Sequence, residues 1–217
     1  MKYIFFAFLS LVFAADDNAP LNRTKDRQVD IKHIKINVSV DLKTKSVFGH
    51  VTHTLIPLKS ELKSFVLDGD DMIIRRVRMK DQDLEFNHSG NKIHIELPNP
   101  ISWNDTVDVR IDYSASPKEG TYFFGPDEIY PKQPWQAWTQ GETEDNHHWV
   151  PLYDYPNERA TFETILTVDQ RFQAVSNGEL VSLKKNENGT HTWHWRENFP
   201  MVAYLISFVV GEFEKVE

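Results

Sequence analysis

The residues most capable of chemistry gather in one stretch, 120–159, which is dense in proline, tryptophan, tyrosine and acids. His147 and His148 are adjacent within it and follow a run of carboxylates, Glu142, Glu144 and Asp145. Imidazole and carboxylate groups are common zinc ligands, so this set suggests a metal site. Neighbouring side chains on extended backbone point to opposite sides, however, so we expect the two rings to point apart and predict no metal ligands here.

Other catalytic chemistries have less support in the sequence. The absence of cysteine excludes a thiolate metal site and a cysteine nucleophile. Ser, His and Asp are present without a G-x-S-x-G turn, so a serine hydrolase is not expected. An all-β enzyme with an unrelated site is a further alternative, but no convergent set of residues favours it. The formal net charge of −8, without a basic stripe, predicts that nucleic acid is not a partner.

The elements that must position this stretch are predicted to be strands. Apolar and polar residues alternate along 34–42 and again along 107–113, a period of two that indicates half-buried strands. Further strands are predicted at 47–55, 64–67, 72–79, 84–87, 92–97, 160–168, 173–175, 190–196 and 202–213. The last is apolar on both faces, as a central strand would be. No window has an apolar stripe at helical period, so we predict an all-β fold, typical of a β-sandwich.

The amino-terminal end has the pattern of a secretory signal. Lys2 is followed by a continuous apolar run, 3–13, and then by the small residue Ala14. The run is shorter than the roughly 20 residues that a membrane-spanning helix needs, although a retained anchor is the alternative. We therefore predict a signal peptide at 1–14, a flexible leader at 15–27 and one domain at 28–217. The expected location is extracellular, cell-surface or periplasmic, with no membrane span after cleavage.

Residues 138–162 carry a specific resemblance. The chain reads W-T-Q-G-E at 138–142 and N-H-H-W-V-P-L-Y-D-Y-P-N-E-R-A-T-F at 146–162. The second segment resembles the A-R-x-x-F-P-C-x-D-x-P-x-x-K-A-T-F stretch in the amino-terminal domain of aminopeptidase N-type zinc metallopeptidases. The matching positions are Pro151, Asp154, Pro156, Ala160, Thr161 and Phe162. His147, Val150 and Leu152 depart from it, and we assign them to packing and loop bracing. Asp154 is expected to brace the loop through an ion pair with Arg159.

The resemblance implies a saddle-like β-sandwich of mostly antiparallel strands with a long irregular functional loop. In that family, a zinc ion bound by H-E-x-x-H and a downstream glutamate activates water, while a G-x-M-E-N segment helps to bind the substrate ammonium. Neither motif occurs in the 217 residues. We therefore predict no catalytic residue and no cofactor in this chain, which should be inactive alone, and zinc is implied for a catalytic domain expected to be missing.

The resemblance also implies a substrate-binding role for Gln140 and Glu142, which fall where the family's amino-terminal domain contributes to the pocket for the substrate amino terminus. The implied partners are a peptide amino terminus and a zinc-binding catalytic domain, in cis or in trans. A carboxylate opposite an ammonium forms a charge-assisted hydrogen bond. The alternative is that Glu142 is only one of several solvated acids in a polar loop.

A function of a different class is a stand-alone, non-catalytic binding or adhesion module that retains the β-scaffold. The missing zinc motifs and the altered His147, Val150 and Leu152 motivate this alternative. Exposed aromatic side chains at Trp135, Trp138 or Trp193 would favour it, because a secreted β-domain can bind partners through such a patch.

Overall fold

The structure is a computed structural model that describes residues 25–214. The predicted signal peptide and most of the predicted leader lie outside the described residues. The all-β prediction is confirmed: three sheets account for the architecture, with two short 3₁₀ helices, η1 (Asn146–His148) and η2 (Ala203–Leu205). Neither of these helices has the length or apolar character required to cross a membrane.

An eight-stranded sheet forms the backbone of the molecule, in the order β13-β14-β11-β1-β2-β8-β4-β5. Its strands are β1 (Val29–Asp41), β2 (Ser46–Pro57), β4 (Met72–Met79), β5 (Gln82–Asp83), β8 (Val107–Ala115), β11 (Ala160–Asp169), β13 (Glu179–Lys185) and β14 (Thr190–Met201). Along most of β1 and β2 the burial alternates, because successive side chains point to opposite faces of a strand, and in β1 the alternation slips at the irregularity between Ile31 and His33. One face of this sheet therefore supplies core residues and the other is polar.

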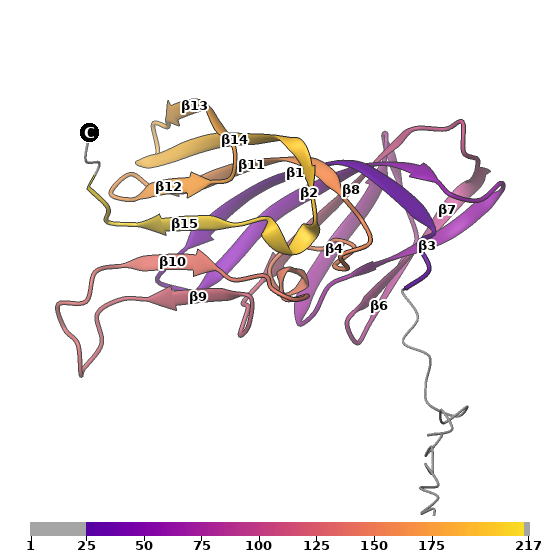
Figure 1. The fold of residues 1–217 in the computed structure, drawn as a ribbon. Helices are drawn as coiled ribbons and strands as arrows, with labels where there is room; N and C mark the ends of the chain where they lie inside the picture. Colours follow the sequence, from indigo (N-terminus) through magenta and orange to yellow (C-terminus); the bar gives the residue numbers. More distant parts are fainter. Residues whose placement is uncertain (1–24, 215–217) are drawn as a thin grey trace, which may run out of the picture.

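Two smaller sheets lie toward opposite ends of the large one (Figure 1). The four-stranded sheet has the order β12-β15-β10-β9, and the three-stranded sheet has the order β3-β7-β6. Their strands are β3 (Leu62–Asp68), β6 (Phe86–Ser89), β7 (Lys92–Ile101), β9 (Thr121–Phe124), β10 (Gln136–Thr139), β12 (Gln173–Ser176) and β15 (Phe208–Gly211). Core residues come from all three sheets, among them Val51, Phe65 and Phe208. The irregular stretch also contributes buried residues, including Trp149 and Leu152.

One local prediction is wrong, one strand was not predicted, and one stretch has more strand pairing than expected. The stretch 202–213 is not one strand: η2 interrupts it and only Phe208–Gly211 is paired. Strand β13 was not predicted, because all of its residues are exposed and no alternating burial marks it in the sequence. The stretch 120–159 is less irregular than expected, since the short strands β9 and β10 lie within it.

One strand pair in the large sheet is parallel. β1 lies beside β11, with Lys35 opposite Glu163, although their sequence positions are 128 apart. Glu163 is buried and bonds across the sheet to His33 and His194, at 3.2 and 2.5 Å. Burial alone would raise the pKa of Glu163, but the His194 bond and the charges of Lys35 and Arg196 lower it. A carboxylate held in this way stays ionised and holds three strands together.

His53 links the large sheet to the irregular stretch. Its side chain is fully buried on β2, and Nε2 lies 2.9 Å from the carbonyl oxygen of Pro151, so this nitrogen is the donor. Nδ1 has no partner among the described residues. Burial lowers the pKa of His53 to about 4, despite the opposing effect of the bond to Pro151. The folded protein therefore keeps this imidazole neutral.

We expect His53 to make the folded state sensitive to mild acid. Below about pH 6.5 the unfolded chain binds a proton that the folded chain does not accept until about pH 4, so the free energy of unfolding falls as the pH drops through this window. Between pH 7.5 and about pH 5 the loss should be about 2 kcal/mol. Urea unfolding at both pH values measures it.

His53→Gln keeps a side-chain N–H for Pro151 but does not titrate, so this variant should lose about 2 kcal/mol less than the wild type over the same pH range. The matched control is His94→Gln, an exposed position on β7, which should behave like the wild type. An unchanged pH dependence in His53→Gln would show that the acid sensitivity arises elsewhere.

Candidate functional site

The candidate site begins where β10 ends. The backbone N–H of Gln140 donates to the carbonyl of Gly120 at 3.0 Å, and Gly141 then enters a tight loop. A Cβ on Gly141 would lie 2.5 Å from the Tyr204 carbonyl oxygen, and a Cβ on Gly120 would lie 2.0 Å from that of Asp145. Gly120 also has a φ of 70°. Glycine at both positions therefore lets the loop pack directly against neighbouring backbone.

Gln140 and Glu142, the two predicted site residues, both have exposed side chains. Within residues 25–214, neither side chain forms a hydrogen bond or an ion pair. Glu144, two residues further on, differs because its carboxylate pairs with Lys25 at 2.7 Å. The loop thus presents one amide and one carboxylate that are free to accept a partner. This arrangement is compatible with the implied substrate-binding role but does not test it.

Asn146 fixes the end of this loop to the rest of the domain. Its side-chain amide is buried and donates to the carbonyls of Ala203 and Ile206 at 2.7 and 2.9 Å. Its Oδ1 accepts from the indole N–H of Trp149 at 2.8 Å. Both amide hydrogens and the carbonyl are therefore used, as a buried amide requires. Asn146 joins η1 to η2, beside the four-stranded sheet.

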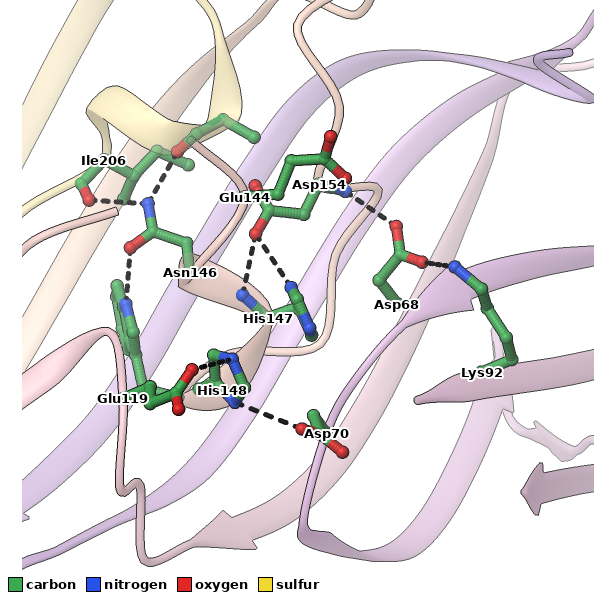
Figure 2. A network of polar contacts seen from close by, with 12 residues as sticks. Asp68, Asp70, Lys92, Glu119, Glu144, Asn146, His147, His148, Asp154 and Ile206 are labelled. Carbon is green, nitrogen blue, oxygen red and sulfur yellow. Dashed lines mark hydrogen bonds and ion pairs between the residues drawn. The ribbon is translucent and has the colours of Figure 1, made fainter. Parts of the chain in front are cut away.

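A chain of polar contacts holds the next residue, His147, in place (Figure 2). Asp154 is buried, and its Oδ2 accepts from both the backbone N–H and the ring Nδ1 of His147, at 3.0 and 3.1 Å. The backbone N–H of Asp154 donates to Asp68 at 2.9 Å, and Asp68 pairs with Lys92. Burial lowers the pKa of His147, but the Asp154 carboxylate outweighs this and the pKa is raised overall.

This geometry corrects one prediction and explains the departures from the family pattern. The partner of Asp154 is His147 rather than Arg159, whose side chain is exposed. His147 braces the loop, as expected. Val150 and Leu152 are fully buried, so both of the other altered positions serve packing.

The two histidines do not point apart. They lie on η1 rather than on extended backbone, and their rings stack with centroids 4.5 Å apart. His148 lies between two acids: its Nδ1 is 3.3 Å from Asp70 and its Nε2 is 3.5 Å from Glu119 (Figure 2). The expectation that the two rings point apart, from which we predicted no metal ligands here, is therefore wrong. No local sequence signal indicated the 3₁₀ turn.

An apolar stripe crosses the outer face of the four-stranded sheet and was not recognised in the sequence. Its members pair across neighbouring strands in register and are at least partly exposed: Tyr122, Trp138, Val209 and Val175. The rings of Tyr122 and Trp138 are 4.7 Å apart. Each strand is only four residues long, so its alternation was too short to assign a face. The stripe ends two residues before Gln140.

The polar groups that this loop displays are suited to binding. The carboxylate of Glu142 can accept hydrogen bonds from an ammonium group. The amide of Gln140 can bond to a polar group next to that ammonium. The zinc ligands that the resemblance implies cannot come from this sequence, because no H-E-x-x-H occurs in it. The residues present do not fit that zinc centre, and no hydrolytic step can be derived from them.

Comparisons with known proteins agree with this description. A family model for the peptidase M1 N-terminal domain matches residues 30–205. Leukotriene A-4 hydrolase of Xenopus laevis is 24% identical over 206 residues, covering 90% of this chain and 34% of the relative. Leucine aminopeptidase 2 of Vanderwaltozyma polyspora is 23% identical over 190 residues, covering 84% and 28%. The chain thus spans about a third or less of these curated relatives.

Solved structures share the fold. An M1 zinc metallopeptidase from Deinococcus radiodurans, determined with a Tyr-Ser-Ala substrate, superimposes with a TM-score of 0.75 at 22% identity, covering 87% of this chain and 43% of that one. Yeast LTA4 hydrolase in complex with bestatin gives a TM-score of 0.75 at 18% identity, covering 88% and 30%.

Removing the Asn146 side chain should destabilise the domain severely. Asn146→Ala would leave the Ile206 carbonyl and the Trp149 indole N–H without their Asn146 partners. It would also remove one of the two donors to the Ala203 carbonyl, which keeps the backbone N–H of Ile206. Each such group costs on the order of 1–3 kcal/mol, so we expect a loss of about 3 kcal/mol in the free energy of unfolding. Denaturant unfolding monitored by tryptophan fluorescence measures this loss.

The control variant is Asn104→Ala, at an exposed position outside every strand. It should change the free energy of unfolding by less than about 0.5 kcal/mol. Equal stability of the two variants would mean that Asn146 does not fasten the loop.

Proposed function

Because the chain belongs to the peptidase M1 N-terminal domain family, we propose that it is the amino-terminal domain of an exported zinc aminopeptidase. In this proposal the domain helps to recognise the amino terminus of a peptide, and it does not hydrolyse peptides by itself. Zinc and the hydrolytic residues belong to a catalytic domain in cis or in trans. The chain supplies Gln140 and Glu142 to the pocket that the two domains share.

The observation that carries this proposal is the free state of Gln140 and Glu142. The neighbouring ionic side chains Glu144 and Asp154 already have partners within the domain. Among the residues that the structure describes, Gln140 and Glu142 have no such partner, although both lie on a loop that is tightly held at Gly141 and Asn146. A rigid loop with free polar groups is suited to bind an ammonium group, because little side-chain order has to be created on binding.

The apolar stripe supports a docking partner next to the same loop. Tyr122, Val175 and Val209 are each more than a third exposed, which is unusual for apolar side chains in register on one sheet face. Aromatic and aliphatic side chains of this kind form the centre of protein interfaces. A catalytic domain seated on the stripe would lie beside Gln140 and Glu142, as the shared pocket requires.

Export is proposed from the amino-terminal sequence alone. The apolar run 3–13 after Lys2 has the length of a signal peptide core. The residues concerned lie outside the described part of the chain. Detection of the processed chain in the medium or periplasm of an expressing cell tests this part of the proposal.

The alternative, a non-catalytic binding or adhesion module, has one relative in its favour. Subunit 2 of transcription initiation factor TFIID from Danio rerio, whose name describes no peptidase, is 25% identical over 245 residues and is covered to 20%. Of the aromatic residues that would favour such a module, Trp135 and Trp193 pack against the core, and Trp138 lies on the apolar stripe beside the Gln140 loop. The proposal of an aminopeptidase domain therefore has the stronger support.

The role of Glu142 can be tested in a polypeptide that joins this chain to its catalytic domain. Glu142→Gln removes the negative charge but keeps the shape of the side chain. We expect a KM for amino-acid amides that is roughly tenfold higher or more, with a smaller change in kcat. The reason is that the ion pair to the substrate ammonium is lost both from the bound substrate and from the transition state. Steady-state kinetics over a series of amides measure both constants.

The control variant is Glu128→Gln, an exposed acid in the loop between β9 and β10. Its KM should match that of the wild type. Identical KM values for the two variants would remove Glu142 from the pocket. The 217-residue chain alone should release no amino acid with or without zinc, and release by that chain would contradict the proposal that it is not catalytic.

The apolar stripe should make the isolated chain self-associate weakly, since no other domain covers it there. We expect the sedimentation coefficient to rise with protein concentration, and Val209→Lys to abolish this rise by placing a charge in the centre of the stripe. Val181→Lys, at a similarly exposed position on β13, is the matched control. A wild-type chain that sediments as a monomer at all concentrations would contradict the role of the stripe as a docking face.

A further inference from the structure

We propose that Asp70, His147 and His148 bind one divalent transition-metal ion of the zinc class. One ligand atom from each of these residues lies within 4.8 Å of the others. The residues come from the turn after β3 and from η1, and a backbone hydrogen bond of 2.9 Å from Asp70 to His147 holds the two elements together. Two imidazoles and a carboxylate are a common ligand set for zinc.

The spacing of the ligand atoms is close to what such an ion needs. Two ligands about 2.0–2.1 Å from a tetrahedral zinc ion are roughly 3.3 Å apart. Nδ1 of His148 and Oδ2 of Asp70 are already 3.3 Å apart. The third ligand atom lies within 4.8 Å of the other two, so the atoms must approach by at most about 1.5 Å, which rotation of the half-exposed Asp70 carboxylate and of the His148 ring can supply.

The supporting contacts around His147 resemble those behind the histidine ligands of known metal sites. Metal-binding histidines usually donate their second ring nitrogen to a carboxylate, which fixes the ring and the tautomer. Here Nδ1 of His147 donates to Asp154, and Asp154 is in turn held by Asp68 (Figure 2). This leaves Nε2 of His147 as the nitrogen with a free lone pair. The arrangement is built from buried carboxylates, so it is not a chance meeting of surface side chains.

The surroundings of the three residues provide access and negative charge. Both imidazoles are only 14% exposed, and His148 lines a pocket with Asp70, Pro117 and Glu119. Glu119 and Asp145 form a separate triad with His148, and Glu119 faces Nε2, across the ring from Asp70, so these two acids add negative charge near the site and are not ligands of the same ion. Among the described residues, three acids, Asp70, Asp71 and Glu119, line this pocket beside a single cation, Lys118. The pocket therefore has an excess of negative charge, which favours a cation.

Zinc binding to the 217-residue chain tests the proposal, and it does not depend on whether the chain belongs to an active peptidase. Isothermal titration with zinc chloride at neutral pH should show one equivalent bound per chain. His148→Gln and Asp70→Asn should each weaken binding at least about tenfold, since each removes a ligand. Asp154→Asn, which removes the support of His147, should weaken it by about 10- to 100-fold.

Two variants serve as controls. Asp71→Asn removes a carboxylate from the same pocket but outside the triad, and His191→Gln removes a histidine from the distant strand β14. Both should bind zinc like the wild type. Asp70 lies on a half-exposed turn, so Asp70→Asn is expected to fold even if Asp154→Asn does not. Circular dichroism confirms the fold of each variant before titration.

The proposal is overturned if the wild-type chain binds no stoichiometric zinc. It is also overturned if His148→Gln and Asp70→Asn, both folded, bind as tightly as the wild type. Loss of binding in these variants together with retention in Asp71→Asn and His191→Gln supports it.

Discussion

Segment 146–158 is buried but irregular, and the arrangement of the three sheets depends on how its polar groups are satisfied. A buried segment without regular pairing must find partners outside itself. The carbonyl of Pro151 receives His53 from the eight-stranded sheet. Leu152 forms an isolated bridge with Asp68 at the end of the three-stranded sheet. Asn146 bonds to the chain just before β15, in the four-stranded sheet. The carboxylate of Glu158 accepts from the backbone of β1 at Ile31.

The position of the candidate site follows from this constraint. The loop that displays Gln140 and Glu142 has a strand of the four-stranded sheet on one side and Asn146 on the other, so it is exposed without being loose. The same segment brings His147 and His148 against the turn after β3. The loop after the four-stranded sheet and the turn after a strand of the three-stranded sheet therefore both lie against segment 146–158. Binding residues placed on a loop and positioned by rigid elements are common in proteins.

The sequence was sufficient for the fold class because alternation is a strong signal where one face of a strand is buried, as in β1, β2 and β8. The fully exposed β13 and the short strands of the apolar stripe lack that signal. Gln140 and Glu142 were predicted from a local motif, and their role stays a prediction. The stacking of His147 on His148 and their approach to Asp70 could not be predicted, because these contacts depend on a 3₁₀ turn and on a residue about 80 positions away.

The parallel pairing of β1 with β11 also has a consequence for the order of events during synthesis. β1 and β2 can form a hairpin early, but the other edge of β1 remains without a partner until residues 160–169 have been made. A long unpaired edge is open to pairing with other chains. The partly made chain is thus more exposed to misassembly than the finished domain, because synthesis must reach the end of β11 at Asp169 before the central sheet can close.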